Sequence, residues 1–330
     1  MDVQLRLFPE ASTAPPPPGV GPASVPDHVR RLAARLPRGV RLGTSSWSFP
    51  GWDGLVYDRP ASEESLARAG LAAYAEHPLL RTVGLDRTYY RPIPAEQFRA
   101  YAEAVPGDFR FLVKADRLLT SPLDPDPHGA RGRNARYLDP GYAAAEVIGP
   151  MIEGLGRKAG VLLFQFPPIP PNLVGGRAAF LRRVERFLSA LPQGPLYAIE
   201  LRTPAFLNDS YAAALDALGA AHCFNVHPSM PPLERQLQVV QPFYQPALVV
   251  RWMLHSGLQY EAARERYQPF DRIVDADPVS RERIATTVLE VVLAERPAFV
   301  IANNKAEGSA PLSLLHLAER ICEWEPSVSP

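Results

Sequence analysis

Short apolar runs rich in β-branched and aromatic residues alternate along this chain with longer segments that show helical spacing of apolar residues. The run "VRLGTSSW" at 40–47, for example, is followed by "SEESLARAGLAAYAEH" at 62–77, where Ser62 suits the helix N-cap position. The runs are almost continuously apolar, as expected of strands that are buried on both faces. The pattern therefore predicts a parallel sheet in which a helix follows each strand.

Eight such strand–helix units fit between residues 38 and 325. The predicted strands lie near 41–46, 81–86, 109–114, 160–165, 196–201, 222–227, 247–252 and 298–303. Eight units in this length are typical of a TIM-type (β/α)8 barrel. A doubly wound open sheet is the alternative, but the sequence has neither a G-x-G-x-x-G fingerprint after a strand nor a phosphate loop. We therefore expect a closed α/β barrel that forms a single domain.

The ends of the chain differ in composition from the barrel segment. Residues 9–26 are rich in Pro, Ala and Gly and carry almost no charge, which predicts a flexible, partly polyproline arm. We accordingly divide the chain into a mostly disordered arm (1–37), the barrel (38–325) and a frayed tail (326–330). The apolar stretch "VQLRLF" at 3–8 is a candidate docking peptide for a protein partner, the alternative being that it has no separate role.

Composition narrows the classes of function. The 330 residues are 46% hydrophobic and 21% charged with a formal net charge of zero, which argues against a dedicated nucleic-acid-binding protein. No 18-residue apolar run and no stretch of signal-peptide type occur, so we expect a cytoplasmic protein that does not enter a membrane. The two cysteines, Cys223 and Cys322, are too few for a disulfide framework or a cysteine-rich metal site.

Polar side chains follow the apolar run at the end of the predicted strands. The last run, for example, stops at Asn303, Asn304 and Lys305. Turn chemistry is one explanation for such an ending. In a barrel, however, all strand carboxyl ends converge on the rim where the active sites of this fold lie. The polar residues at these ends include Trp47, Asp86, Lys114, Gln165, Glu200, Arg202, Asn225, His227, Arg251, His255, Asn303 and Asn304. This mixture of acids, amides, histidines and basic groups favours a site at the rim.

We assign catalytic roles to Lys114, Glu200 and Asp86. Lys114 ends an apolar strand, where a lysine is costly to bury unless it is paired. It can form a Schiff base, bind phosphate or stabilise an oxyanion, or else form a structural ion pair with Glu200 or Asp86. Glu200 can act as a general base, with a structural pair to Arg202 as the alternative.

A second group of rim residues is assigned to substrate binding. Arg251 suits a phosphate or carboxylate, Gln165 and Asn303 would orient the substrate, and Trp47 would stack on a sugar or base or else plug the barrel. The whole group is Trp47, Gln165, Arg202, Arg251, His255, Asn303 and Asn304.

A metal site is a weaker hypothesis. Aspartate, glutamate and histidine ligands suit a divalent metal ion, although no spacing such as H-E-x-x-H supports one here. The metal and cofactor requirements therefore stay open. The candidate ligands are Asp86, Glu200, His227 and His255.

Five motifs resemble, in order, those of the YecE-like family, known as domain of unknown function 72. They are "GTSSWSFPGW", "FLVKADRLLT", "LLFQFPP", "AIELRTPAF" and "VIANNKAEGSAPLSLL", and the resemblance extends over about residues 40–323. It implies a TIM-type barrel related in shape to endonuclease IV-like and sugar-isomerase-like barrels, but no reaction. Two departures stand out. Gly84 and Asp86 replace a glutamate and an asparagine of the family motif, and His255 lies two positions later than the family histidine.

Three hypotheses about function follow. The first is an enzyme that performs acid–base chemistry of hydrolase, lyase or isomerase type on a small anionic or polyol substrate, with Lys114 and Glu200 as the reactive pair. The second is a metal-dependent phosphodiester-processing enzyme of endonuclease IV-like type. The third is a non-catalytic binding or scaffold protein that uses the barrel mouth or the arm. A small-molecule ligand is the expected partner, whereas nucleic acid is not.

Overall fold

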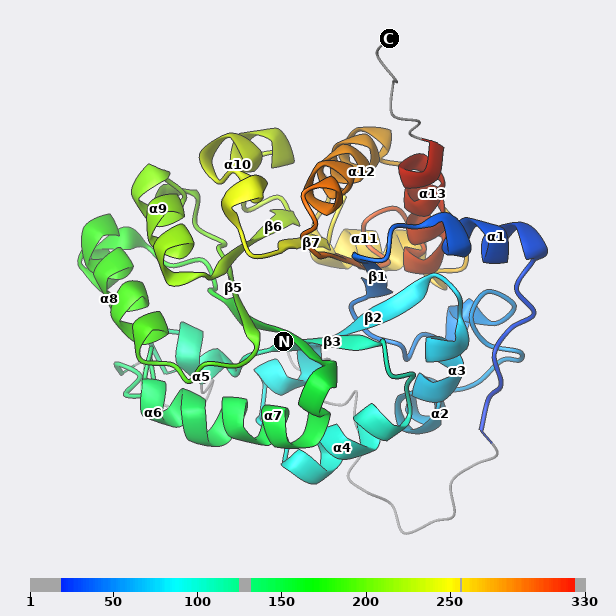
Figure 1. The fold of residues 1–330 in the computed structure, drawn as a ribbon, viewed down its shortest axis with the longest axis horizontal. Coiled ribbons are helices and arrows are strands. Elements are labelled where there is room, and N and C mark those ends of the chain that lie inside the picture. Colours follow the sequence, from blue (N-terminus) through cyan, green and yellow to red (C-terminus); the bar gives the residue numbers. More distant parts are fainter. Residues whose placement is uncertain (1–18, 125–131, 256, 324–330) are drawn as a thin grey trace.

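The computed structural model describes residues 19–124, 132–255 and 257–323. Eight parallel strands pair in chain order and close into a barrel, because β8 pairs with β1. Helices surround this barrel, as Figure 1 shows. The strands are β1 (Val40–Thr44), β2 (Leu80–Leu85), β3 (Arg110–Lys114), β4 (Ala159–Gln165), β5 (Leu196–Glu200), β6 (Ala221–Val226), β7 (Leu248–Trp252) and β8 (Ala298–Ala302). Every predicted strand is present, with ends that differ by at most two residues, and the predicted barrel is confirmed.

Helices follow the strands where the sequence places helical patterns. They are α2 (Glu63–Ala69), α3 (Leu71–Glu76), α4 (Ala95–Glu103), α5 (Arg117–Thr120), α6 (Pro140–Tyr142), α7 (Gly149–Leu155), α8 (Arg177–Ser189), α9 (Asp209–Leu218), α10 (Leu233–Val239), α11 (Tyr260–Tyr267), α12 (Pro278–Leu293) and α13 (Ala310–Glu323). The expected cap at Ser62 is present, since its side chain accepts a hydrogen bond from Ser65 N at 3.2 Å. In the described part of the chain, no helix is both long and apolar enough to cross a membrane.

A helix that sequence analysis missed precedes the barrel. Helix α1 (Asp27–Arg35) lies within the segment expected to be a mostly disordered arm, and it packs beside α13 (Figure 1). Its buried residues Val29, Leu32 and Ala33 explain why it is ordered. Residues 19–26 are also held, since Ala23 N donates to Val56 O at 2.9 Å. The arm predicted at 9–26 therefore does not extend into this part, while residues 1–18 and the tail at 326–330 lie outside the described residues.

The barrel interior is filled by alternate residues of each strand. Leu112, Leu163, Ala198, Val249 and Ile301 belong to one buried cluster inside the barrel. Because side chains alternate along a strand, the residues two positions later point the same way at the carboxyl end. These are Lys114, Gln165, Glu200, Arg251 and Asn303. The interior is thus apolar below and becomes polar at the mouth.

Candidate functional site at the barrel mouth

Arg251 lies at the centre of the barrel mouth and is 1% exposed. Its Nη1 donates to Glu200 Oε2 at 2.7 Å and to Gln165 Oε1 at 3.3 Å, while its Nη2 donates to Asp86 Oδ2 at 3.0 Å. Burial acts to lower the pKa of Arg251, but Asp86 and Glu200 outweigh this and raise it. The structure thus brings four predicted residues together. Both terminal nitrogens of Arg251 already bond protein oxygens, which leaves them little capacity for a substrate anion.

Glu200 is completely buried between Arg251 and Arg202. Burial acts to raise the pKa of Glu200, but Arg202 and then Arg251 outweigh it and lower the pKa to about 2. Glu200 therefore stays ionised at neutral pH and is a weak base there. Its Oε1 forms an ion pair with Arg202 but has no well-directed hydrogen bond within the described residues. The geometry favours the structural-pair alternative for these two residues.

Lys114 differs from its neighbours because it makes no ion pair with any described residue. Its Nζ lies 3.8 Å from the centroid of the Tyr89 ring, and its side chain is 7% exposed. Burial lowers the pKa of Lys114 to about 8, and Asp86 partly opposes this shift. The short helix Asp86–Tyr89 that carries the ring is tied to β3, since Thr88 Oγ1 donates to Lys114 O at 2.6 Å. Of the alternatives for Lys114, a direct ion pair with Glu200 or Asp86 is not observed.

His227 follows β6 and is half-buried near the two arginines. The backbone N–H of Ser229 donates to His227 Nδ1 at 3.1 Å, which assigns the proton of the neutral ring to Nε2. Burial lowers the pKa of His227 to about 4, and Arg202 adds to this. At neutral pH the ring is therefore uncharged and can donate a hydrogen bond through Nε2.

The adjacent amides Asn303 and Asn304 hold the loop that follows β8. Asn303 Nδ2 donates to Ser45 Oγ at 2.8 Å, and its Oδ1 accepts from Lys305 N at 3.0 Å. Asn304 Oδ1 accepts from Trp52 Nε1 at 3.3 Å and from Ala310 N, the first residue of α13, at 2.8 Å. Both side chains are thus used in shaping the loop. The turn explanation of this strand end, considered in the sequence, accounts for their contacts.

Trp47 lies outside the barrel rather than over its mouth. It is 4% exposed, and its Nε1 donates to Leu66 O of α2 at 3.0 Å. Its ring packs edge-on to Tyr101 of α4 at 5.4 Å between centroids. These contacts correspond to a packing role, so the expected stacking on a ligand has no support from this placement.

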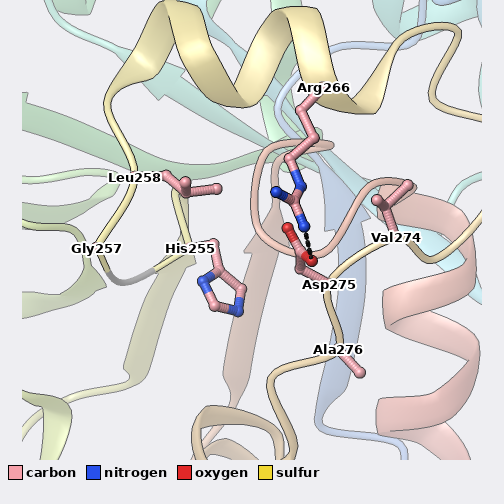
Figure 2. A pocket seen from close by; sticks show the side chains of 7 residues that line it. All are labelled: His255, Gly257, Leu258, Arg266, Val274, Asp275 and Ala276. Atoms are coloured by element: carbon pink, nitrogen blue, oxygen red, sulfur yellow. Dashed lines mark hydrogen bonds and ion pairs between the residues drawn. The ribbon is translucent and has the colours of Figure 1, made fainter.

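His255 lines a separate hollow of about 480 Å³ beside α11, shown in Figure 2. In that hollow Arg266 and Asp275 form an ion pair of 2.7 Å, and Tyr267 also donates to Asp275 at 2.7 Å. The backbone N–H of His255 donates to Lys305 O at 2.9 Å. The backbone of His255 therefore adjoins the mouth, while its side chain faces the hollow that contains Asp275 (Figure 2).

The four candidate metal ligands do not form a ligand set. Asp86 and Glu200 both bond Arg251, and His255 lines another hollow. Over residues 19–124, 132–255 and 257–323, no group of three or more His, Cys, Asp and Glu side chains could hold a metal ion. The donor geometry therefore gives no support to a metal centre at the mouth.

Lys305 is the mouth residue that sequence analysis left out of the site. Its side chain is 5% exposed, with Nζ 4.1 Å from the centroid of the Tyr260 ring. Burial lowers the pKa of Lys305 to about 8, as it does for Lys114. A signal was present in the sequence, because only three of its 35 basic residues are lysines.

Comparison with known proteins identifies the family. A family model described as "Protein of unknown function DUF72" matches residues 41–328. The chain belongs to the DUF72 family. DUF72 and the YecE-like family are the same, so the resemblance seen in the five motifs is confirmed. A search of curated proteins returned no match.

Solved structures of DUF72 proteins share the barrel. A protein from Enterococcus faecalis V583 is 21% identical, with 88% of this chain and 98% of that chain covered and a TM-score of 0.56. A protein from Thermotoga maritima MSB8 is 20% identical, with 85% and 98% covered and a TM-score of 0.57. Identities this low extend the likeness to the fold alone.

Proposed function

We propose that the barrel mouth is the active site of an enzyme that performs acid–base chemistry on a small anionic substrate. The observation that carries the proposal is Lys114, a buried amine that lies on the Tyr89 ring instead of in an ion pair. With a pKa lowered to about 8, roughly a tenth of the amine is neutral at pH 7. Lys114 is then the general base.

The surrounding groups support this role for Lys114. Asp86, with a third of its side chain exposed, is held by Arg251 beside the amine and is the second group able to reach a substrate. Glu200 acts by holding Arg202 and Arg251 in place, since its low pKa makes it a poor base. These proposed roles differ from the Lys114–Glu200 reactive pair expected from the sequence.

Charge supports an anionic substrate. Four cationic side chains meet at the mouth, and two carboxylates oppose them. The excess positive charge in a poorly solvated site favours binding of an anion. The cations are Lys114, Arg202, Arg251 and Lys305, and the carboxylates belong to Asp86 and Glu200.

The test is a screen of sugar phosphates, 2-oxo acids and hydroxy acids by thermal shift, followed by product detection by NMR. With a compound that is turned over, Lys114→Met should lower the rate about 10²–10⁴-fold, the usual contribution of a general base. The wild-type rate should rise as pH rises through about 8, where Lys114 loses its proton. Lys158→Met is the control, because Lys158 donates to Ala102 O and Val105 O away from the mouth. Unchanged turnover in Lys114→Met would contradict the proposal, and a screen without any stabilising compound would favour a scaffold.

A further inference from the structure

The distribution of lysine singles out two positions. Of the three lysines in the chain, Lys158 directly precedes β4 and donates hydrogen bonds of 2.6 Å to the backbone carbonyls of Ala102 and Val105. The other two, Lys114 and Lys305, are buried at the mouth. Lysine offers a compact charge and an amine that can lose its proton, neither of which arginine provides. In a chain that otherwise uses arginine, the two mouth lysines are therefore candidates for a role that uses these properties.

The loop after β8 fixes the backbone of Lys305. Its N–H donates to Asn303 Oδ1 at 3.0 Å, and its carbonyl accepts from His255 N at 2.9 Å. Its Nζ lies 4.1 Å from the Tyr260 ring centroid and 5.8 Å from that of Phe270. The position of Lys305 is thus set by the hydrogen bonds of its backbone and by the contacts of its Nζ with two aromatic rings.

The charged groups around Lys305 come from two elements. Helix α11 contributes Glu261 and Arg264, and the short helix after β2 contributes Asp86. None of them forms an ion pair with Lys305 within the described residues, and Lys305 is 5% exposed, so it is not entirely removed from solvent. Contact with a ring returns only about 0.5–2 kcal/mol, less than the several kcal/mol that burying an ammonium costs. An anionic ligand would complete this environment.

The two lysines lie on opposite sides of β2. Lys114 ends β3, which pairs with β2 on one side, whereas Lys305 follows β8, which is joined to β2 through β1 on the other. Asp86 follows β2, and its carboxylate raises the pKa of both lysines against the effect of burial. Each ammonium rests on a tyrosine ring, Tyr89 or Tyr260. The mouth therefore has two amine-bearing halves.

We infer that Lys305 forms an oxyanion-binding subsite, so that the substrate carries a phosphate or carboxylate group apart from the atoms that react beside Lys114. The position of the reacting atoms rests on the proposed function. The subsite itself rests on the placement of Lys305 and can be tested without turnover.

The experiment is calorimetric titration with sulfate, as a tetrahedral oxyanion, and with acetate, at pH 8 in two buffers that differ in ionisation enthalpy. Wild type should bind one of the two anions and take up protons, because a bound anion raises the lowered pKa of Lys305. Preference for sulfate identifies a phosphate group, and preference for acetate a carboxylate. Lys305→Met should weaken binding at least about tenfold and abolish most of the proton uptake.

Three further variants sharpen the test. Lys114→Met should weaken binding less than Lys305→Met does, and Lys158→Met should leave it unchanged. Lys305→Arg should keep binding but lose the proton uptake, and it replaces Lys305→Met if that variant does not fold. Equal anion affinity in wild type and Lys305→Met, or no binding of either anion, would overturn the subsite. The proposed function fails on a different result, namely turnover that survives Lys114→Met.

Discussion

At the residue scale, the positively charged side chains of the mouth lie in two kinds of environment. The arginines bond carboxylates, whereas Lys114 and Lys305 rest on rings. Ion pairs keep groups such as Arg251 permanently charged, whereas desolvation without a bonded partner makes an amine titrate near neutral pH. Residues of the same charge type thus differ in pKa according to their partners.

Glu200→Gln should destabilise the protein by about 3–5 kcal/mol at pH 7, because it leaves two buried arginines without their shared carboxylate. The stabilisation from Glu200 is present above the unfolded pKa of 4.5 and is lost as pH falls toward about 2. The free energy of unfolding, measured with urea, should therefore fall more between pH 7 and pH 3 for wild type than for the variant. Glu265→Gln, on the exposed face of α11, is the control, and a variant as stable as wild type would refute the argument.

The mouth lysines should also make the protein more stable as pH rises, but in the alkaline range. Their folded pKa of about 8 lies below the ordinary 10.5, so between these values the unfolded state binds more protons. The free-energy cost of burying the charged lysines is fully present below pH 8. It is relieved as pH rises toward 10.5, by about 1.4 kcal/mol per pH unit for each lysine. Relative to the double variant Lys114→Met/Lys305→Met, wild type should gain stability over this range. Urea denaturation at pH 7, 8.5 and 10 measures the free energy of unfolding of both proteins. If the difference between wild type and the double variant were the same at all three pH values, these shifts would be contradicted.

At the scale of elements, the loop between β8 and α13 joins the site to the packing of the barrel. One amide, Asn303, bonds Ser45 directly after β1 and the backbone of Lys305. The next amide, Asn304, bonds the start of α13 and Trp52. The same loop that ends a strand and starts a helix therefore presents a mouth residue. A change in its caps should affect both stability and the position of Lys305.

Asn304→Ala should cost about 2–3 kcal/mol, because it removes a cap and leaves the buried Trp52 Nε1 without its acceptor. Asn208→Ala is a matched control, since Asn208 caps α9 by one hydrogen bond of 3.2 Å to Tyr211 N. That change should cost about 1 kcal/mol. Urea denaturation followed by tryptophan fluorescence compares the two. Equal losses would show that the bond to Trp52 contributes nothing.

At the scale of the whole molecule, the packed structure begins before β1. Helix α1 buries Val29 and Leu32, and Arg35 Nη2 donates to Cys322 O at the end of α13 at 2.6 Å. The helix is thus an additional layer on the barrel (Figure 1). Its stabilisation should be measurable as a separate contribution.

A chain that begins at residue 37 should be less stable than one that begins at residue 19 by roughly 3–6 kcal/mol, since each fully buried large apolar side chain contributes about 1.5–3 kcal/mol. Denaturant unfolding of the two chains measures the difference. In the full chain, Leu32→Ala should reproduce part of the loss, and Arg31→Ala on the exposed face should not. If the shorter chain were equally stable, α1 would be only a loosely attached segment.

The sequence by itself determined the eight strands, their order and the direction of their side chains. These depend on local periodicity, so Lys114, Gln165, Glu200 and Arg251 could be placed at the mouth before any contact was known. Helix α1 was not predicted, because the composition of the segment before it is dominated by Pro, Ala and Gly.

Only the tertiary structure decided which of these groups bond one another. Arg251 and Asp86 are 165 positions apart, and their bond exists because the barrel closes. Closure also places Trp47 against helices and the side chain of His255 in another hollow, and it leaves Lys114 and Lys305 on aromatic rings. Charge and pKa at a buried site depend on such neighbours, which local sequence does not specify.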